Sequence, residues 1–212
     1  MGENMFFPEL KRRNEKDYLN NLAQFYADYR QNYSKVSEDC KHRCVYCDIT
    51  VNECGGDEMQ LDHFRPQKHF KNLDTHPYNL YLSCPKCNVL KTSDWPCSKN
   101  TDDAPSFIGG VGYLDRFEHK ADNFLRVEED GTIVHLAGPV NYMIKKMKLN
   151  RASRVNIRRR RKIESKKTKL LEGIERLTNK LIEDCSQSKI NGKELSLRLT
   201  EIKHLFSMCQ EV

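Results

Sequence analysis

The sequence predicts an α+β fold, and three observations support this prediction. Two stretches of the 212-residue chain, 14–36 and 170–209, repeat apolar residues at the helical spacings of three and four. The stretch 124–138 alternates loosely around the turn-like segment EEDGT, which indicates a β-hairpin. Between these, residues 40–97 are rich in Cys, His, Pro and Asn and have only short apolar runs. That composition is typical of a small module held together by something other than a large core.

These patterns divide the chain into four parts. An N-terminal helical segment, 1–39, precedes the cysteine-rich module at 40–97, and residues 98–148 form a loop followed by the β-hairpin. Residues 149–212 form a basic helix and a helical hairpin, because two periodic apolar stretches flank the polar link SQSKINGK. This hairpin either packs against the helix at 14–36 or offers a docking surface to a partner or a second copy of the chain.

The composition is that of a globular protein without a membrane span. Hydrophobic residues make up 38% of the chain and charged residues 31%, and no run approaches the roughly 18 apolar residues that a span needs. The first residues lack a basic segment followed by an apolar one, so we expect a cytoplasmic protein. The chain has nine cysteines, and clustered cysteines in a reducing compartment are more often metal ligands than disulfide partners.

Two CxxC pairs, CVYC and CPKC, predict a structural zinc site. Each pair can sit on a tight turn, and two such turns complete a tetrahedral Zn²⁺ site that leaves no open position for water. Between the pairs lie 36 residues, so a substantial element must be inserted there. Cys40 and Cys54 are close enough in sequence to be rival ligands, and two unrelated cysteine pairs in a reduced core are the alternative interpretation. The predicted ligands are Cys44, Cys47, Cys84 and Cys87.

The order of motifs around these pairs resembles the HNH endonucleases, which have a ββα-metal fold with zinc knuckles. The pattern reads C-x2-C, then LDHxxP, then NL, then C-x2-C-N-x2-K, over residues 44–91. Asn88 stands where the third letter of the family motif is His, a variant that keeps a metal-binding oxygen. The resemblance implies a small ββα core with a zinc knuckle, here surrounded by an N-terminal helix and a C-terminal helical hairpin.

The resemblance also implies a role for each polar residue of the pattern. His63 is the general base that activates water, and Asp62 and Asn88 are ligands of a catalytic Mg²⁺ or Mn²⁺. Asn79 corresponds to the middle letter of the motif, which orients the base, and Lys91 is expected to contact the phosphate. The chemistry agrees, because a neutral histidine suits a base at pH 7 and hard cations prefer oxygen ligands. Taken singly, these residues also fit a surface salt bridge, a turn or a helix cap.

A basic run at 149–169 favours a nucleic-acid partner, DNA first and RNA as the alternative. It carries ten Lys or Arg against one Glu, and such residues bind phosphates without sequence preference. A solvated helix face is the competing interpretation. In a helix, four consecutive arginines surround the axis, so part of the run could instead pack through its aliphatic stems. The residues predicted to bind nucleic acid are Lys91, Arg158, Arg159, Arg160, Arg161 and Lys162.

We interpret the chain as a metal-dependent HNH endonuclease that hydrolyses DNA. The layout of its extensions resembles the nuclease subunits of Septu-type bacterial anti-phage systems, which implies an ATPase subunit as partner, with a homodimer as the alternative. The competing hypothesis is a non-catalytic zinc-knuckle module that binds nucleic acid or protein. The intact set of Asp62, His63 and Asn88 favours the enzyme, because a degraded nuclease would tolerate their loss.

Overall fold

The computed structural model describes residues 5–211, so the ends of the predicted first and last parts, 1–4 and Val212, lie outside the described residues. The described chain forms two compact units, one up to Arg158 and one from Arg159 onward. Helices and short antiparallel strands make up an α+β fold, as predicted. Within the described range, none of the helices combines the length and apolar character that crossing a bilayer requires.

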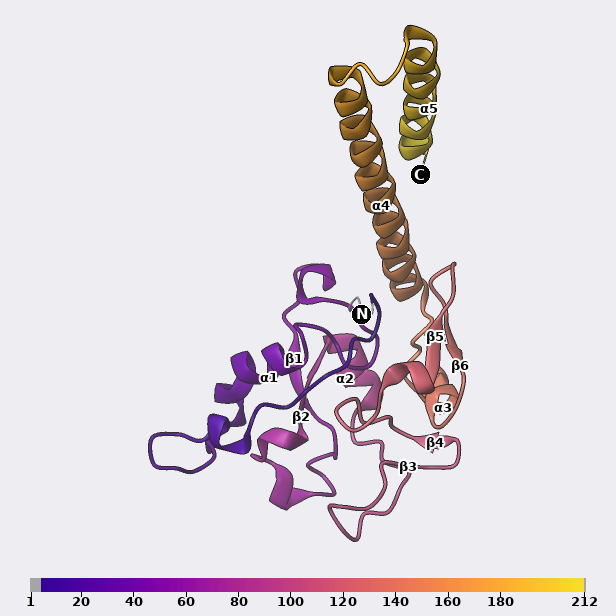
Figure 1. Cartoon of the computed structure of the whole chain (residues 1–212). Helices are drawn as coiled ribbons and strands as arrows, with labels where there is room; N and C mark the ends of the chain where they lie inside the picture. The colour runs from indigo at the N-terminus through magenta and orange to yellow at the C-terminus, as the bar shows by residue number, and fades with distance from the viewer. Residues whose placement is uncertain (1–4, 212) are drawn as a thin grey trace. The chain divides into compact units, whose positions relative to one another are not determined.

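The first unit is organised around a ββα element. Strand β1, Gln60–His63, pairs antiparallel with β2, Leu80–Ser83, and helix α2, Pro85–Lys91, follows directly (Figure 1). The register places Asp62 opposite Tyr81, and every residue of β2 is buried. The predicted ββα core is therefore confirmed, and it places Asp62 on a strand that packs against buried residues.

The predicted helix at 14–36 does not form. The side-chain oxygen of Asn20 accepts hydrogen bonds from the backbone N–H groups of Leu22 and Gln24, at 2.8 and 3.2 Å. Such local bonds give the backbone an alternative to helical hydrogen bonds, so Asn20 prevents a helix despite the apolar periodicity. Leu22, an apolar residue within this predicted helix, is 78% exposed. The elements that form instead are two 3₁₀ turns, η1 (Glu15–Tyr18) and η2 (Tyr29–Asn32), and one short helix, α1 (Tyr33–Asp39).

The N-terminal segment is held against β2 by an arginine. A terminal nitrogen of Arg12 donates to the backbone oxygens of Tyr78 and Leu80, both at 2.9 Å. The same guanidinium lies 3.6 Å from the centroid of the Phe117 ring, a cation–π distance. A non-helical segment is thereby fixed to the strand that supports the site.

The predicted β-hairpin at 124–138 is confirmed, and the loop predicted to precede it from residue 98 onward contains a second, shorter hairpin. Gly112 makes this second hairpin possible: its φ is 131°, and a Cβ there would lie 2.4 Å from the backbone oxygen of Ser106. The elements of this region are β3 (Phe107–Ile108), β4 (Val111–Gly112), η6 (Ala121–Asn123), β5 (Leu125–Val127), β6 (Ile133–His135) and α3 (Val140–Lys146).

The predicted helical hairpin is confirmed, and the basic run is part of its first helix. Helix α4, Ala152–Ser186, is continuous from the basic run to the turn, and α5, Gly192–Glu211, returns beside it (Figure 1). An ion pair between Arg198 and Asp184, at 2.7 Å, joins the two helices near the turn. The alternative in which this hairpin packs against a helix at 14–36 falls away with that helix.

Arg158 differs from the prediction that it binds nucleic acid, because its side chain is fully buried. Its guanidinium donates to the backbone oxygens of Gly131, Leu149 and Cys47, at 2.7, 3.0 and 3.3 Å. Arg159 and Arg160 are exposed, whereas Arg161 and Lys162 are half-buried. Consecutive helical residues point in different directions, so Arg158 is buried at the end of the first unit while Arg159 and Arg160 face solvent.

Replacing Arg158 with Met should lower the free energy of unfolding by about 3 kcal/mol, because several buried carbonyls lose their donor. Urea unfolding would measure this change, with Arg159→Met as the matched control on the exposed neighbour, for which a change within about 0.5 kcal/mol is expected. Equal effects of the two substitutions would contradict the structural role of Arg158.

Candidate functional site

Four buried thiols converge in the first unit and form a candidate metal centre. Their sulfur atoms all lie within 4.8 Å of one another. The first pair lies on a turn closed by bonds from Cys44 N to Ile49 O and from Asp48 N to Cys44 O, at 2.8 and 2.9 Å. The second pair lies at the N-terminus of α2, with Cys84 at the cap position. The residues of this centre are the four predicted ones, Cys44, Cys47, Cys84 and Cys87.

The donor set fits a structural zinc ion. Tetrahedral zinc with Zn–S bonds of about 2.3 Å separates its sulfur ligands by roughly 3.8 Å, and the sulfurs of Cys47 and Cys84 are 3.7 Å apart. Cys40 is not part of the centre, since its sulfur accepts a hydrogen bond from Leu82 N at 3.4 Å. Cys54 also lies outside the group. The question of rival ligands is thereby answered in favour of the two CxxC pairs.

Two arginines cover this centre, and neither was expected there. A terminal nitrogen of Arg151 lies 3.7 Å from the sulfur of Cys84 and 3.6 Å from that of Cys87. A terminal nitrogen of Arg154 lies 3.5 Å from the Cys84 sulfur. Hydrogen bonds with the neighbouring thiols lower the pKa of Cys84. Four thiolates around one Zn²⁺ carry a net charge of about −2, so two guanidinium groups are the matching counter-charge. Part of the basic run thus faces the metal centre.

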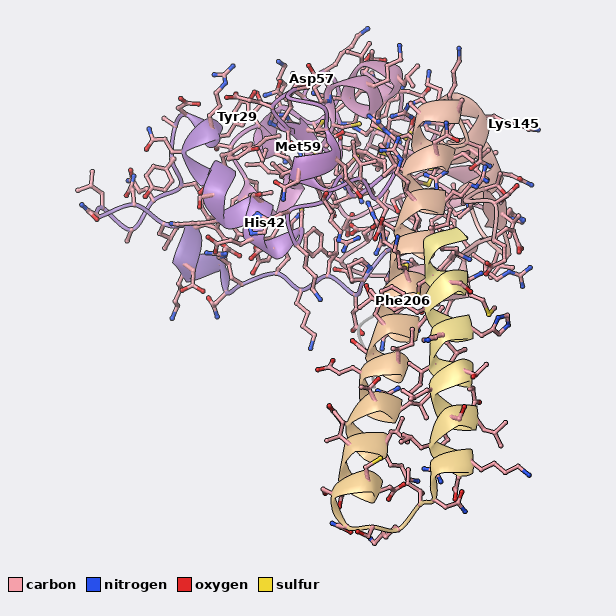
Figure 2. All side chains as sticks on the ribbon, turned by 90° about the horizontal axis from the view of Figure 1, so that it is seen from above. Tyr29, His42, Asp57, Met59, Lys145 and Phe206 are labelled. Atoms are coloured by element: carbon pink, nitrogen blue, oxygen red, sulfur yellow. The ribbon has the colours of Figure 1, made fainter. Side chains whose placement is uncertain are left out.

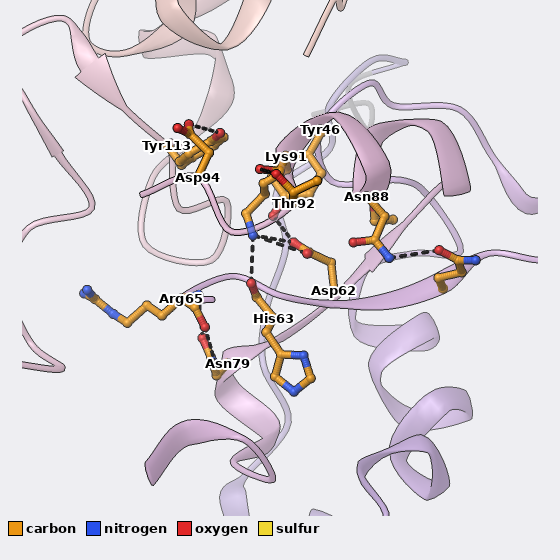
Figure 3. Close-up of polar contacts among 12 residues, drawn as sticks. Tyr46, Asp62, His63, Arg65, Asn79, Asn88, Lys91, Thr92, Asp94 and Tyr113 are labelled. Atoms are coloured by element: carbon orange, nitrogen blue, oxygen red, sulfur yellow. Dashed lines mark hydrogen bonds and ion pairs between the residues drawn. The ribbon is translucent and has the colours of Figure 1, made fainter. Parts of the chain in front are cut away.

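Asp62 lies on β1 and points toward α2 (Figure 3). Its carboxylate accepts a hydrogen bond from the Tyr46 hydroxyl at 2.5 Å and forms an ion pair with the Lys91 ammonium at 3.0 Å. Asp62 is only 4% exposed, so these partners replace the water that a charged carboxylate needs. Tyr46 is a residue that the sequence reasoning missed, although it lies inside the CVYC motif.

Lys91 is placed differently from the expectation of a phosphate contact. Its side chain is fully buried, and its ammonium donates to the backbone oxygen of His63 at 2.7 Å as well as to Asp62. One buried cation therefore fixes two consecutive residues of β1. Burial of a charged group is tolerated only with such pairing, so this contact defines the position of the strand.

His63 points away from Asp62, as expected of neighbouring strand residues (Figure 3). Its Nε2 lies 2.7 Å from the backbone oxygen of Asp74. A carbonyl only accepts, so this contact assigns the proton to Nε2 and leaves Nδ1 as the basic nitrogen of the neutral ring. The ring of Tyr29 packs edge-on at 4.7 Å between centroids. Burial lowers the pKa of His63, although Asp74 and Asp62 act in the opposite direction.

Asn79 does not contact the His63 ring through its side chain. Its amide oxygen accepts from Arg65 N at 2.8 Å and its amide nitrogen donates to Arg65 O at 3.0 Å. Asn79 therefore holds the chain just after His63, and the contact that orients the ring comes from the Asp74 backbone. A backbone acceptor leaves no signal in a sequence, because any residue type provides one.

Asn88 is carried by α2 beside β1. Its amide nitrogen donates to Oε1 of Gln60 at 2.8 Å, which turns the amide oxygen toward Asp62 (Figure 3). A cavity of about 340 Å³ is lined by Asp62, His63 and Asn88 together. The structure therefore brings the predicted base and both predicted oxygen ligands to one cavity. Asn79 and Lys91 do not line this cavity, and they hydrogen-bond instead to the backbone of Arg65 and His63.

Comparison with known proteins agrees with this geometry. Residues 44–94 match the family model described as HNH endonuclease, a stretch that contains both CxxC pairs, β1, β2 and α2. No curated protein and no solved structure matches the chain. The elements η2 and α4 lie outside the matched stretch.

If Arg151 and Arg154 compensate the charge of a zinc-thiolate centre, replacing both with Gln should speed zinc release. A hydrogen bond to a charged group contributes about 1.5–3 kcal/mol, so release to a chromogenic chelator should accelerate roughly tenfold or more. Arg159→Gln together with Arg160→Gln is the control, since these substitutions remove the same charge at exposed positions of the same basic run. Equal release rates in both double variants would argue against a specific role.

Proposed function

We propose, starting from the HNH endonuclease domain at residues 44–94, that the chain is a metal-dependent endonuclease that hydrolyses DNA phosphodiester bonds. The observation that carries this proposal is the cavity shared by His63, Asp62 and Asn88. It combines a histidine that is neutral near pH 7 with two side chains that offer oxygen ligands, and metal-assisted phosphodiester hydrolysis with a general base uses both features.

His63 is the general base in this proposal. Its Nδ1 takes a proton from a water molecule, whose oxygen then forms a bond to phosphorus while the bond to the leaving sugar oxygen breaks. The Asp74 carbonyl, 2.7 Å from Nε2, holds the ring in place and stabilises the imidazolium that results. Lys91 acts beneath the site by fixing the backbone of His63 and the carboxylate of Asp62.

Asp62 and Asn88 are the proposed ligands of a catalytic Mg²⁺ or Mn²⁺. The Asn88 amide oxygen accepts no hydrogen bond from residues 5–211, and each carboxylate oxygen has more than one acceptor site. Mg²⁺ commonly binds through one or two such side chains and keeps several waters. The chemistry that such a cation supplies when bound is stabilisation of the negative charge that develops on the leaving oxygen.

A non-catalytic binding module is the second candidate, and one observation favours it. The Asp62 carboxylate already pairs with the Lys91 ammonium at 3.0 Å, and a cation at this carboxylate must share it with that positive charge. In this reading the zinc centre and the exposed arginines of α4 only hold nucleic acid. The two candidates differ in whether His63 is needed for a chemical step.

We also propose that exposed basic residues of α4 bind DNA phosphates and that the chain works with a protein partner. Arg159 and Arg160 are exposed, which supports contact with phosphate. In the second unit, Leu177 and Phe206 are 43% and 50% exposed, which supports a docking role for the hairpin. An ATPase subunit of a cytoplasmic anti-phage system is the proposed partner, and co-purification with and without α5 would test it.

Supercoiled plasmid incubated with Mg²⁺ or Mn²⁺ should be nicked by the wild-type protein and not by His63→Ala. The loss should reach about 10²-fold or more, because general-base catalysis contributes about 10²–10⁴-fold. His69→Ala is the matched control, since that ring lies 3.3 Å from Ser93 O and His69 does not line the cavity. Zinc content and thermal unfolding of all three proteins would show that the fold is intact. Undiminished nicking by His63→Ala would refute the assignment of the base.

A further inference from the structure

Two adjacent cavities lie along β1, and an N-terminal tyrosine forms a wall of both. The first, of about 340 Å³, contains His63, and the second, of about 460 Å³, continues along the strand toward Met59. Both are lined by Tyr29, Leu61 and Asn88. We call the two cavities together the site groove. Tyr29 and Met59 lie on the same side of the first unit in Figure 2.

Tyr29 is held in place by its local structure and by the catalytic candidate itself. The Asp28 side chain caps η2 by accepting from Arg30 N at 3.1 Å. The Tyr29 ring packs edge-on against the His63 ring, with an interplanar angle of 75°, and remains half-buried. Because η2 lies outside residues 44–94, this wall comes from a part of the chain that the family model does not cover.

A cation accompanies this aromatic wall. The guanidinium of Arg30 lies 5.2 Å from the Tyr29 ring centroid, and its side chain is 74% exposed. Its ion pair with Asp28 is at 3.6 Å, and an exposed pair of this kind contributes little, so phosphate can replace the carboxylate. Tyr33, 36% exposed, lines the same groove beyond Arg30. Aromatic rings with interleaved cations are the surface on which unpaired nucleotides bind.

We propose that the site groove binds an unpaired DNA strand, with the base that flanks the scissile phosphate stacked on Tyr29. In an intact duplex the bases are stacked inside and only their edges face the grooves, so an aromatic wall has no base face to bind. A single strand offers a base face to the ring, and its phosphate can then lie beside His63 and Arg30. The inference rests on the proposed function and adds that its substrate is single-stranded or locally unpaired.

The test is a binding measurement with three fluorescein-labelled 20-nucleotide probes, in Ca²⁺ instead of Mg²⁺ and at fixed salt. The probes are a mixed-sequence single strand, the same strand paired with its complement, and a strand with all bases removed. The proteins are wild type, Tyr29→Phe, Tyr29→Leu and Tyr26→Leu. Tyr26 is the matched control, because it lies in the same segment, lines neither cavity and contacts the Lys35 ammonium at 5.5 Å.

We expect Tyr29→Leu to weaken single-strand binding by roughly 5- to 100-fold, the loss expected for one stacked base. Tyr29→Phe and Tyr26→Leu should bind as wild type, and the base-free probe should bind wild type and Tyr29→Leu equally. A loss of the same size on the base-free probe would overturn the proposal, because Tyr29 would then act only through the shape of the site. Duplex bound more tightly than single strand would also overturn it.

Plasmid nicking by the same preparations keeps this result separate from the proposed function. Single-strand binding that depends on Tyr29, by a wild-type protein that cleaves neither the plasmid nor the single-stranded probe in Mg²⁺ or Mn²⁺, would refute the endonuclease and leave the base-binding groove standing. Nicking by Tyr29→Leu at the wild-type rate, with unchanged affinity for the single strand, would refute the groove and leave the endonuclease standing.

Discussion

The close approach of four thiols is the interaction on which the first unit depends. Cys44 and Cys47 precede β1 and Cys84 and Cys87 follow β2, so a metal ion held by all four closes a loop that contains the whole two-stranded ribbon. A two-stranded ribbon alone is at best marginally stable in water. In such small modules the free energy of metal binding contributes directly to folding. The two arginines that cover the centre link it to the first turn of α4.

The second constraint is electrostatic and lies directly beneath the site. Lys91 is fully buried between the Asp62 carboxylate and the His63 carbonyl, with Tyr46 as a further donor to Asp62. A buried ion pair of this kind contributes more to the uniqueness of an arrangement than to its stability, because desolvation offsets much of the attraction. In this chain the ion pair fixes the directions of two neighbouring side chains: Asp62 points toward α2 and His63 points toward the site groove.

The sequence was sufficient for the features that depend on local spacing. The CxxC pairs, the hairpin at 124–138 and the two C-terminal helices follow from residues close together in the chain, and the structure has all of them. The helix at 14–36 was predicted from periodicity alone, and Asn20 interrupts it with its own hydrogen bonds. Lys91 and Arg158 show a different limit. Lys91 ends the CPKCNVLK motif and Arg158 belongs to the basic run, and whether such a charged side chain meets solvent or a buried carbonyl is decided by distant elements.

Asn79 and Asp74 show a third limit. The contact to the His63 ring, which was expected from the Asn79 side chain, comes from the backbone of Asp74. The group that holds the His63 ring is a carbonyl oxygen, which every amino acid carries. The identity of residue 74 is therefore not what natural selection would need to preserve. What must be kept is the length and path of the chain between His63 and that oxygen, which Asn79 pins at Arg65. Relatives of this chain should consequently vary in the amino acid at position 74, and insertions or deletions between His63 and Asp74 should be rare.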